Sequence, residues 1–246
     1  MHIYKNLGGK GSGWRGVEIK QREIEIFKFL LEMRFSTAKQ IWLRFYKKDH
    51  HPTSAYPWKW VEKRLRKLKW AGYIRTARSH SYPHQLYLAT GKARSELERY
   101  GITCEGLPPL YGIDFKTFEH DLTLVDIRIS LENLGYTYYS ERELRMVLRT
   151  GRIPDGTIER SGKKIALELE ISQKRRERYI EIFKEYALSP FQCVAYLVTL
   201  PSMPDYLLGV AEELRMDQIY CGAICSPKED REIKLKNMMG KEVVLS

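Results

Sequence analysis

Cysteine is scarce in this sequence, and long apolar runs are missing from it. Four cysteines in 246 residues are too few for the disulfide framework of a small secreted domain, so we interpret them as reduced thiols. No stretch reaches the roughly 18 consecutive apolar residues that a membrane-spanning helix needs. The first residues also lack the apolar core of a signal peptide. We therefore expect a cytoplasmic protein without a membrane partner.

A glycine loop that binds phosphate is also missing. Residues 8–13 contain Gly-Lys-Gly-Ser, but they have neither the preceding strand nor the spacing of such a loop. Glycine at this density costs too much backbone entropy to be fixed in one conformation. We therefore interpret residues 1–19 as a flexible basic arm.

Acidic residues are few in the first part of the chain. Residues 1–106 contain 22 basic and only 9 acidic side chains, whereas residues 107–246 contain 20 basic and 22 acidic ones. The formal net charge of +11 therefore originates entirely in the first part. This segregation indicates a first domain that binds a polyanion and a second domain with another role.

Helical periodicity dominates the first part. Apolar residues recur at spacings of three and four over 21–34, 37–46 and 58–70, with Ser36 as the expected N-cap of the second helix. Gly72 ends the third helix, and the β-prone runs 73–76 and 85–88 form a hairpin before a short helix at 91–100. Three helices followed by a hairpin predict a winged helix-turn-helix domain over residues 20–106, an α+β part of the molecule.

The third predicted helix is strongly basic. Val61, Leu65 and Leu68 form its apolar stripe, and tryptophans 58, 60 and 70 are interpreted as packing residues. A basic helix of this kind fits the major groove of double-stranded DNA. The alternative is a solvated basic surface. The predicted DNA-binding residues on the helix and the hairpin are Lys59, Lys63, Arg64, Arg66, Lys67, Arg75, Arg78, His80 and His84.

Helices and strands alternate in the second part, which begins after a linker at 106–109. The pattern predicts a helix at 115–134, an extended segment at 136–148, strands at 152–158 and 163–171, a helix at 172–188, a strand at 192–199, a helix at 203–215 and a strand at 218–225. This α-β-β-β-α-β order predicts an α/β domain, residues 107–246, with one mixed sheet flanked by helices.

Acidic residues interrupt two of these strands. Glu168 and Glu170 share one face of a strand, and Asp155 lies on the strand that is expected to pair beside it. Three converging carboxylates, with Glu119 as a fourth, are ligands suited to Mg²⁺, and a bound metal activates water for phosphodiester hydrolysis. The alternative is a scaffold ion network in which the acids pair with Lys163, Lys174 or Arg175.

Pro154-Asp155, a spacer and Glu168-Leu169-Glu170 within this order resemble the PD-(D/E)XK nuclease superfamily. With the winged helix, the chain resembles the replication-relaxation family of plasmid and mobile-element proteins over residues 20–225. The resemblance implies a restriction-endonuclease-like second domain with Asp155, Glu168 and Glu170 in the catalytic site. The superfamily's usual lysine is replaced by Glu170, and Lys174 is the candidate substitute.

Three functions follow. The first, which the resemblance implies, is a DNA-binding accessory protein of plasmid or mobile-element replication or transfer, with replication or transfer proteins as partners. Its nuclease-like second domain is either active or inactive, because the usual lysine is missing. The second is an Mg²⁺-dependent DNA endonuclease that its winged helix directs to DNA. The third is a transcriptional regulator whose second domain forms a homodimer.

Overall fold

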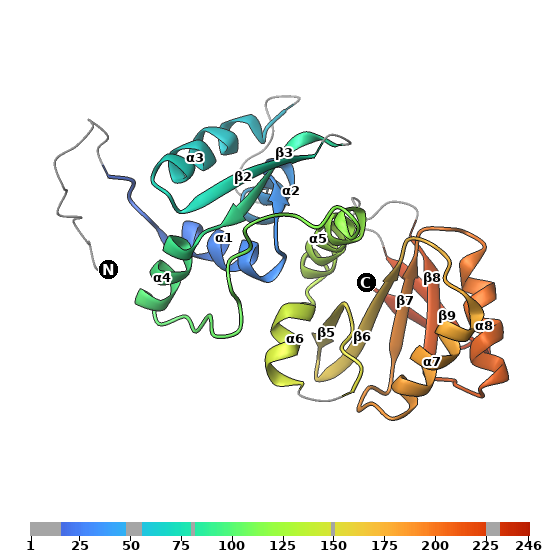
Figure 1. Ribbon diagram of the computed structural model, residues 1–246. Coiled ribbons are helices and arrows are strands. Elements are labelled where there is room, and N and C mark those ends of the chain that lie inside the picture. Colours follow the sequence, from blue (N-terminus) through green and yellow to red (C-terminus); the bar gives the residue numbers. More distant parts are fainter. Residues whose placement is uncertain (1–15, 48–55, 80–81, 149–150, 225–231) are drawn as a thin grey trace. The chain divides into compact units, whose positions relative to one another are not determined.

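The structure is a computed structural model that describes residues 16–47, 56–79, 82–148, 151–224 and 232–246 (Figure 1). Contacts within the chain divide it into two compact units. The first unit extends to Cys104 and includes Pro108–Gly112, and the second contains Glu105–Leu107 and Ile113–Ser246. Residues 105–112 alternate between the two units, and the predicted domain boundary, between residues 106 and 107, lies among them. Residues 1–15 of the predicted basic arm lie outside the described residues.

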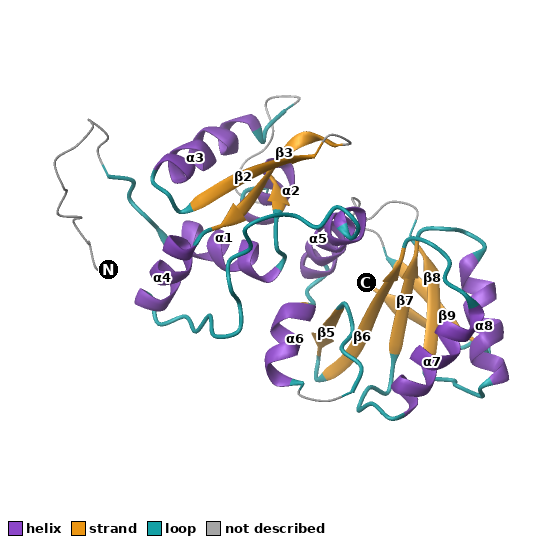
Figure 2. Cartoon of the chain, in the orientation of Figure 1, coloured by secondary structure: helices purple, strands orange, loops and turns teal. Residues whose placement is uncertain are grey.

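The described residues of the first unit form four helices and a small antiparallel sheet. Its elements are α1 (Gln21–Glu32), β1 (Ser36–Thr37), α2 (Ala38–Phe45), α3 (Lys59–Trp70), β2 (Ile74–Ser79), β3 (Tyr82–Ala89) and α4 (Gly91–Arg99). The strands are ordered β1-β3-β2, so the longest of them, β3, is central. Figure 2 shows β2 and β3 as a hairpin, with α3 alongside it.

The apolar stripes of the sequence form the core of this unit. Ile24, Phe27 and Leu30 of α1 are buried, and the Phe27 ring stacks on Tyr73 with centroids 5.3 Å apart. The N-cap prediction for α2 was wrong by one residue. Ser36 belongs to β1, and the Thr37 hydroxyl accepts the N-cap hydrogen bond from the amide of Gln40.

In the second unit, the strands of the described residues form one mixed sheet of seven strands. Its elements are α5 (Phe118–Asn133), β4 (Thr137–Ser140), α6 (Glu141–Val147), β5 (Gly156–Arg160), β6 (Lys163–Glu170), α7 (Arg176–Ala187), β7 (Val194–Val198), α8 (Met203–Glu213), β8 (Ile219–Ala223), β9 (Ile233–Asn237) and β10 (Glu242–Leu245). The strand order is β10-β9-β8-β7-β6-β5-β4. Strands β6, β7 and β8 are parallel to one another, and the remaining pairings are antiparallel. The expectation of a mixed α/β protein is confirmed.

Two details of the second unit differ from the prediction. The expected extended segment at 136–148 is a short strand followed by the helix α6, because Ser140 and Glu143 form a capping box that starts a helix. Strands β9 and β10 add a hairpin to the sheet beyond the last predicted strand.

Helices α7 and α8 cover one face of this sheet. Tyr179 and Phe183 of α7, Leu207 of α8 and Tyr196 of β7 are fully buried in a single apolar cluster, which also contains Ala166 of β6. Side chains alternate along a strand, so Glu168 and Glu170 project from the same face as Ala166. The helices of the described residues include none that is long and apolar enough to cross a membrane.

Candidate functional site

Helix α3 is anchored to the first unit by the predicted stripe. Val61, Leu65 and Leu68 are fully buried, and they hold one side of the helix against its unit. The helix ends at Trp70, and Gly72 follows its C-cap residue with a φ of 80°, in the left-handed region that glycine adopts without strain. The backbone amide of Tyr73 then returns to the carbonyl of Leu68, 3.0 Å away, before β2 begins.

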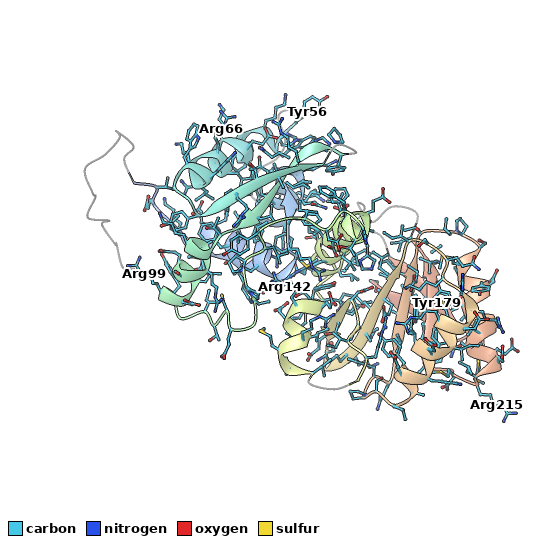
Figure 3. The ribbon with its side chains drawn as sticks, in the orientation of Figure 1. Tyr56, Arg66, Arg99, Arg142, Tyr179 and Arg215 are labelled. Atoms are coloured by element: carbon cyan, nitrogen blue, oxygen red, sulfur yellow. The ribbon has the colours of Figure 1, made fainter. Side chains whose placement is uncertain are left out.

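The outward side of α3 carries a basic surface, which we define as Lys59, Lys63, Arg66 and Lys67. All four side chains are exposed, and Figure 3 shows Arg66 projecting away from the helix. Lys59, Lys63 and Arg66 recur at spacings of four and three, so they follow one stripe along the helix. Among the described residues, none of the four has an ion-pair partner, although the Lys59 Nζ lies 4.9 Å from the centre of the Tyr56 ring.

Two predicted DNA-binding arginines make intramolecular contacts instead. The Arg64 Nε donates to the Glu23 carboxylate at 2.8 Å, and its Nη2 donates to the backbone carbonyl of Glu18. The Arg75 guanidinium lies 4.7 Å above the Tyr111 ring and donates to the Tyr111 carbonyl at 3.2 Å. Both arginines are half-buried, so their first role is to tie elements of this unit together.

The β2–β3 hairpin presents the remaining predicted residues. Arg78 on β2 and His84 on β3 are exposed, and the His84 ring meets the Tyr82 ring edge to face with centroids 5.4 Å apart. His80 lies outside the described residues. The prediction that the tryptophans pack is wrong for Trp70, which is 57% exposed, while Trp60 is 38% exposed.

The predicted acidic residues meet where β5 begins and β6 ends. Gly156 pairs with Leu167 across these antiparallel strands, which places Asp155 next to Glu168. A Cβ atom on Gly156 would lie 2.4 Å from the Tyr138 hydroxyl oxygen, so the close approach of this ring requires glycine. The Asp155 carboxylate accepts a hydrogen bond from the amide of Leu169 at 2.8 Å, which fixes it against β6.

Glu168 is buried in an ion pair that the sequence did not indicate. The Arg152 Nε and Nη2 both lie 3.0 Å from its Oε1, and the Tyr186 hydroxyl of α7 donates to the same oxygen. Burial raises the pKa of Glu168 to about 7, with a further increase from the charge of Asp155, while Arg152 and Tyr186 oppose the shift. The partner is thus Arg152, and neither Lys163 nor Arg175 provides it.

Glu170 is held by the lysine that was the candidate catalytic substitute. The Lys174 ammonium donates to the Glu170 carboxylate, and the Lys174 backbone amide donates to the Tyr179 hydroxyl at 3.0 Å. Burial raises the pKa of Glu170, Lys174 opposes this shift, and the charge of Asp155 adds to it. The pairing of Glu170 with Lys174 is the one that the scaffold-network alternative predicted.

Asp155 pairs with a histidine of α5. The His120 Nε2 lies 3.1 Å from the Asp155 Oδ2, and its Nδ1 lies 3.7 Å from the Asp121 Oδ1. Burial lowers the pKa of His120, but the hydrogen bonds and charges of Asp121 and Asp155 outweigh burial and raise it to about 10. Burial likewise opposes ionisation of Asp155, yet His120 and the amide of Leu169 lower its pKa. At neutral pH this pair is therefore ionic.

The acidic residues do not fit a magnesium site in this arrangement. Asp155, Glu168 and Glu170 each have a cationic partner, whereas Mg²⁺ takes free carboxylate oxygens and water. Glu119, the predicted fourth ligand, is exposed, and its backbone carbonyl accepts from the hydroxyl of Thr123. Among the described residues, no three His, Cys, Asp or Glu side chains are grouped to hold a metal ion. The three carboxylates nevertheless lie close enough for the charge of Asp155 to raise the pKa of both glutamates.

Sequence reasoning missed three members of this cluster, which are His120, Arg152 and Tyr186. His120 directly follows Glu119, the predicted metal ligand, but it is His120 whose side chain reaches Asp155. Arg152 and Tyr186 lie 16 and 18 residues from Glu168, and no spacing rule connects them. No protein-family model and no curated protein matches the sequence, so similarity to known proteins assigns no role to these residues.

Proposed function

We propose that this protein binds double-stranded DNA through the basic surface of α3. The observation that carries the proposal is the exposure of Lys59, Lys63, Arg66 and Lys67 on a helix whose opposite side is buried. Cations without acidic partners keep their full charge for phosphate oxygens, and binding gains free energy when condensed counterions leave the DNA. Arginine and lysine on such a helix also reach base edges in the major groove.

The order of elements supports a winged helix-turn-helix assignment for the first unit. The helices α1, α2 and α3 are followed by the β2–β3 hairpin, and the short β1 pairs with β3. In that arrangement α3 takes the place of the recognition helix, which enters the major groove. The hairpin takes the place of the wing, where Arg78 and His84 would contact the DNA backbone.

For the second unit, we propose a nuclease-like fold that serves as a scaffold. The succession α5-β4-α6-β5-β6-α7-β7, with β7 parallel to β6, supports the fold, and α6 is an addition to the predicted order. The ion pairs of Asp155, Glu168 and Glu170 support a structural role for the acids. The proposed biological role is that of a DNA-binding accessory protein in plasmid or mobile-element replication or transfer.

An endonuclease is the second candidate function. It is favoured by the mutual repulsion of the three carboxylates, because a divalent cation that displaced the basic side chains would relieve it. A transcriptional regulator that dimerises through its second unit would use the same α3 surface. Sedimentation of the protein alone and with DNA measures that dimerisation.

Fluorescence anisotropy with a labelled duplex tests DNA binding. The triple variant Lys63→Ala, Arg66→Ala and Lys67→Ala should bind more weakly, and the slope of log K against log salt should flatten by about three units. The triple variant Lys234→Ala, Lys236→Ala and Lys241→Ala is the control. It removes the same charge from exposed positions of the second unit and should bind as the wild type does. Equal effects of the two triple variants would reject the α3 assignment.

Incubation of supercoiled plasmid with Mg²⁺ or Mn²⁺ tests the second candidate. We expect no nicking, because each carboxylate is neutralised by a basic side chain. Nicking that disappears in the Glu168→Gln variant would establish the endonuclease and reject the scaffold role.

A further inference from the structure

A groove runs along the side of α3 that faces the start of α1. It has a volume of about 730 Å³, and its lining includes Lys20, Arg22, Tyr46, Trp60, Lys63 and Lys67. Lys63 and Lys67 belong to the basic surface of α3 as well. The groove and the proposed DNA-binding surface are therefore continuous along one helix.

The wall of the groove is aromatic. The Tyr46 and Trp60 rings meet edge to face with centroids 4.7 Å apart, and the Arg22 guanidinium covers the Tyr46 ring at 4.5 Å. Tyr46 is buried, whereas Trp60 keeps 38% of its surface exposed. Its indole thus contacts Tyr46 and also presents an exposed part at the groove.

The charge of the groove is positive. Five basic and two acidic side chains line it, and both acids are engaged by lining residues. Glu23 accepts from Arg64 at 2.8 Å, and Glu18 lies 3.7 Å from the Lys20 ammonium. Lys63 and Lys67 keep their charge for a ligand, so the groove favours an anion with an aromatic part.

We propose that this groove binds an unpaired nucleotide next to the duplex that α3 holds. The inference rests on the proposed DNA binding and adds a DNA structure to it, the junction of duplex and single strand. A base inside a duplex is stacked on its neighbours and paired, so it is not available to an indole. An unpaired base stacks on an exposed aromatic ring while lysines hold its phosphates.

Anisotropy with two labelled duplexes tests the proposal, one blunt and one identical except for a short single-stranded overhang. The wild type should prefer the overhang duplex by at least about fivefold, the smallest effect expected from stacking of one base. Trp60→Ala should abolish this preference and leave the affinity for the blunt duplex unchanged, and Trp60→Phe should keep part of it. Trp60→Leu replaces Trp60→Ala if circular dichroism shows that the alanine variant is unfolded.

Trp70→Ala is the matched control. Trp70 is an exposed tryptophan of the same helix, but it lies outside this groove, beside Arg66 and Tyr87. Its removal should change the affinity for both duplexes by the same factor. A wild type that binds both duplexes equally overturns this inference alone, as does a Trp60 variant that loses affinity for both equally. Failure to bind either duplex overturns the proposed function.

Discussion

Removal of Arg152 tests the ionic character of the acidic cluster most directly. Glu168 is 3% exposed and Arg152 is 20% exposed, and the Glu185 carboxylate lies 3.8 Å from the Arg152 Nη1. Loss of one partner from a fully buried ion pair costs about 3–5 kcal/mol. Because Arg152 is partly in contact with water, we expect the Arg152→Met variant to lose about 3 kcal/mol where Glu168 is fully ionised, near the lower limit of this range.

The loss should depend on pH, and its sign follows from the Glu168 carboxyl. Its pKa is about 7 in the folded protein, above its ordinary value, and removal of Arg152 raises it further. A carboxyl with a raised folded-state pKa is stabilising below its unfolded pKa, and the stability is lost as pH rises through the folded pKa. One pH unit corresponds to about 1.4 kcal/mol for this carboxyl. Arg152→Met should therefore be nearly neutral at pH 5, lose about 1.4 kcal/mol at pH 8 and approach its full loss near pH 9.

Urea denaturation followed by circular dichroism at both pH values measures the effect. A thermal melt should show a decrease in Tm of about 3–6 °C at pH 8, since about 1 kcal/mol corresponds to 2–4 °C in a chain of this size. Arg178→Met is the control, because Arg178 and Glu181 form an exposed pair at 2.9 Å. Its removal should change stability by less than about 1 kcal/mol.

The double variant Arg152→Met and Glu168→Gln should recover part of the loss, because it leaves no buried charge unpaired. An Arg152→Met variant that is more stable than the wild type at pH 8 would refute the ion-pair interpretation. A wild-type Tm that increases in millimolar Mg²⁺ would do the same, since it would identify the acids as metal ligands.

Two further perturbations address the same region. His120→Gln should remove a decline in stability between pH 6.5 and 10. A histidine with a raised pKa stabilises the fold below its unfolded pKa, and this stabilisation is lost as the pH rises through its folded pKa of about 10. Tm measured from pH 6.5 to 10 checks this prediction, and a profile equal to that of the wild type would contradict the pairing with Asp155. Gly156→Ala should lower the free energy of unfolding by about 1–3 kcal/mol, because the added Cβ would lie 2.4 Å from the Tyr138 hydroxyl oxygen. Denaturation of Gly156→Ala with and without Tyr138→Leu measures this loss. An equal loss in both backgrounds would argue against a clash with the Tyr138 ring.

Much of the secondary structure could be predicted from the sequence, for a local reason. The spacing of Val61, Leu65 and Leu68 predicts both the existence of α3 and its buried side, because a helix with an apolar stripe must bury it. The same spacing predicts which lysines remain exposed. The error at 136–148 is also local, since the capping box formed by Ser140 and Glu143 is visible in the sequence and outweighs the β-propensity of the preceding tyrosines.

The partners of the acids were decided by tertiary structure alone. Glu168 and Glu170 share a strand face as predicted, but Arg152 and Tyr186 reach Glu168 from two other segments, and His120 reaches Asp155 from a distance of 35 residues. Electrostatic energy depends on distances in space, and periodicity determines distances only within one element. The sequence therefore determined which faces are basic, acidic and apolar, whereas the packing of α5 and α7 against the sheet decided which charges meet.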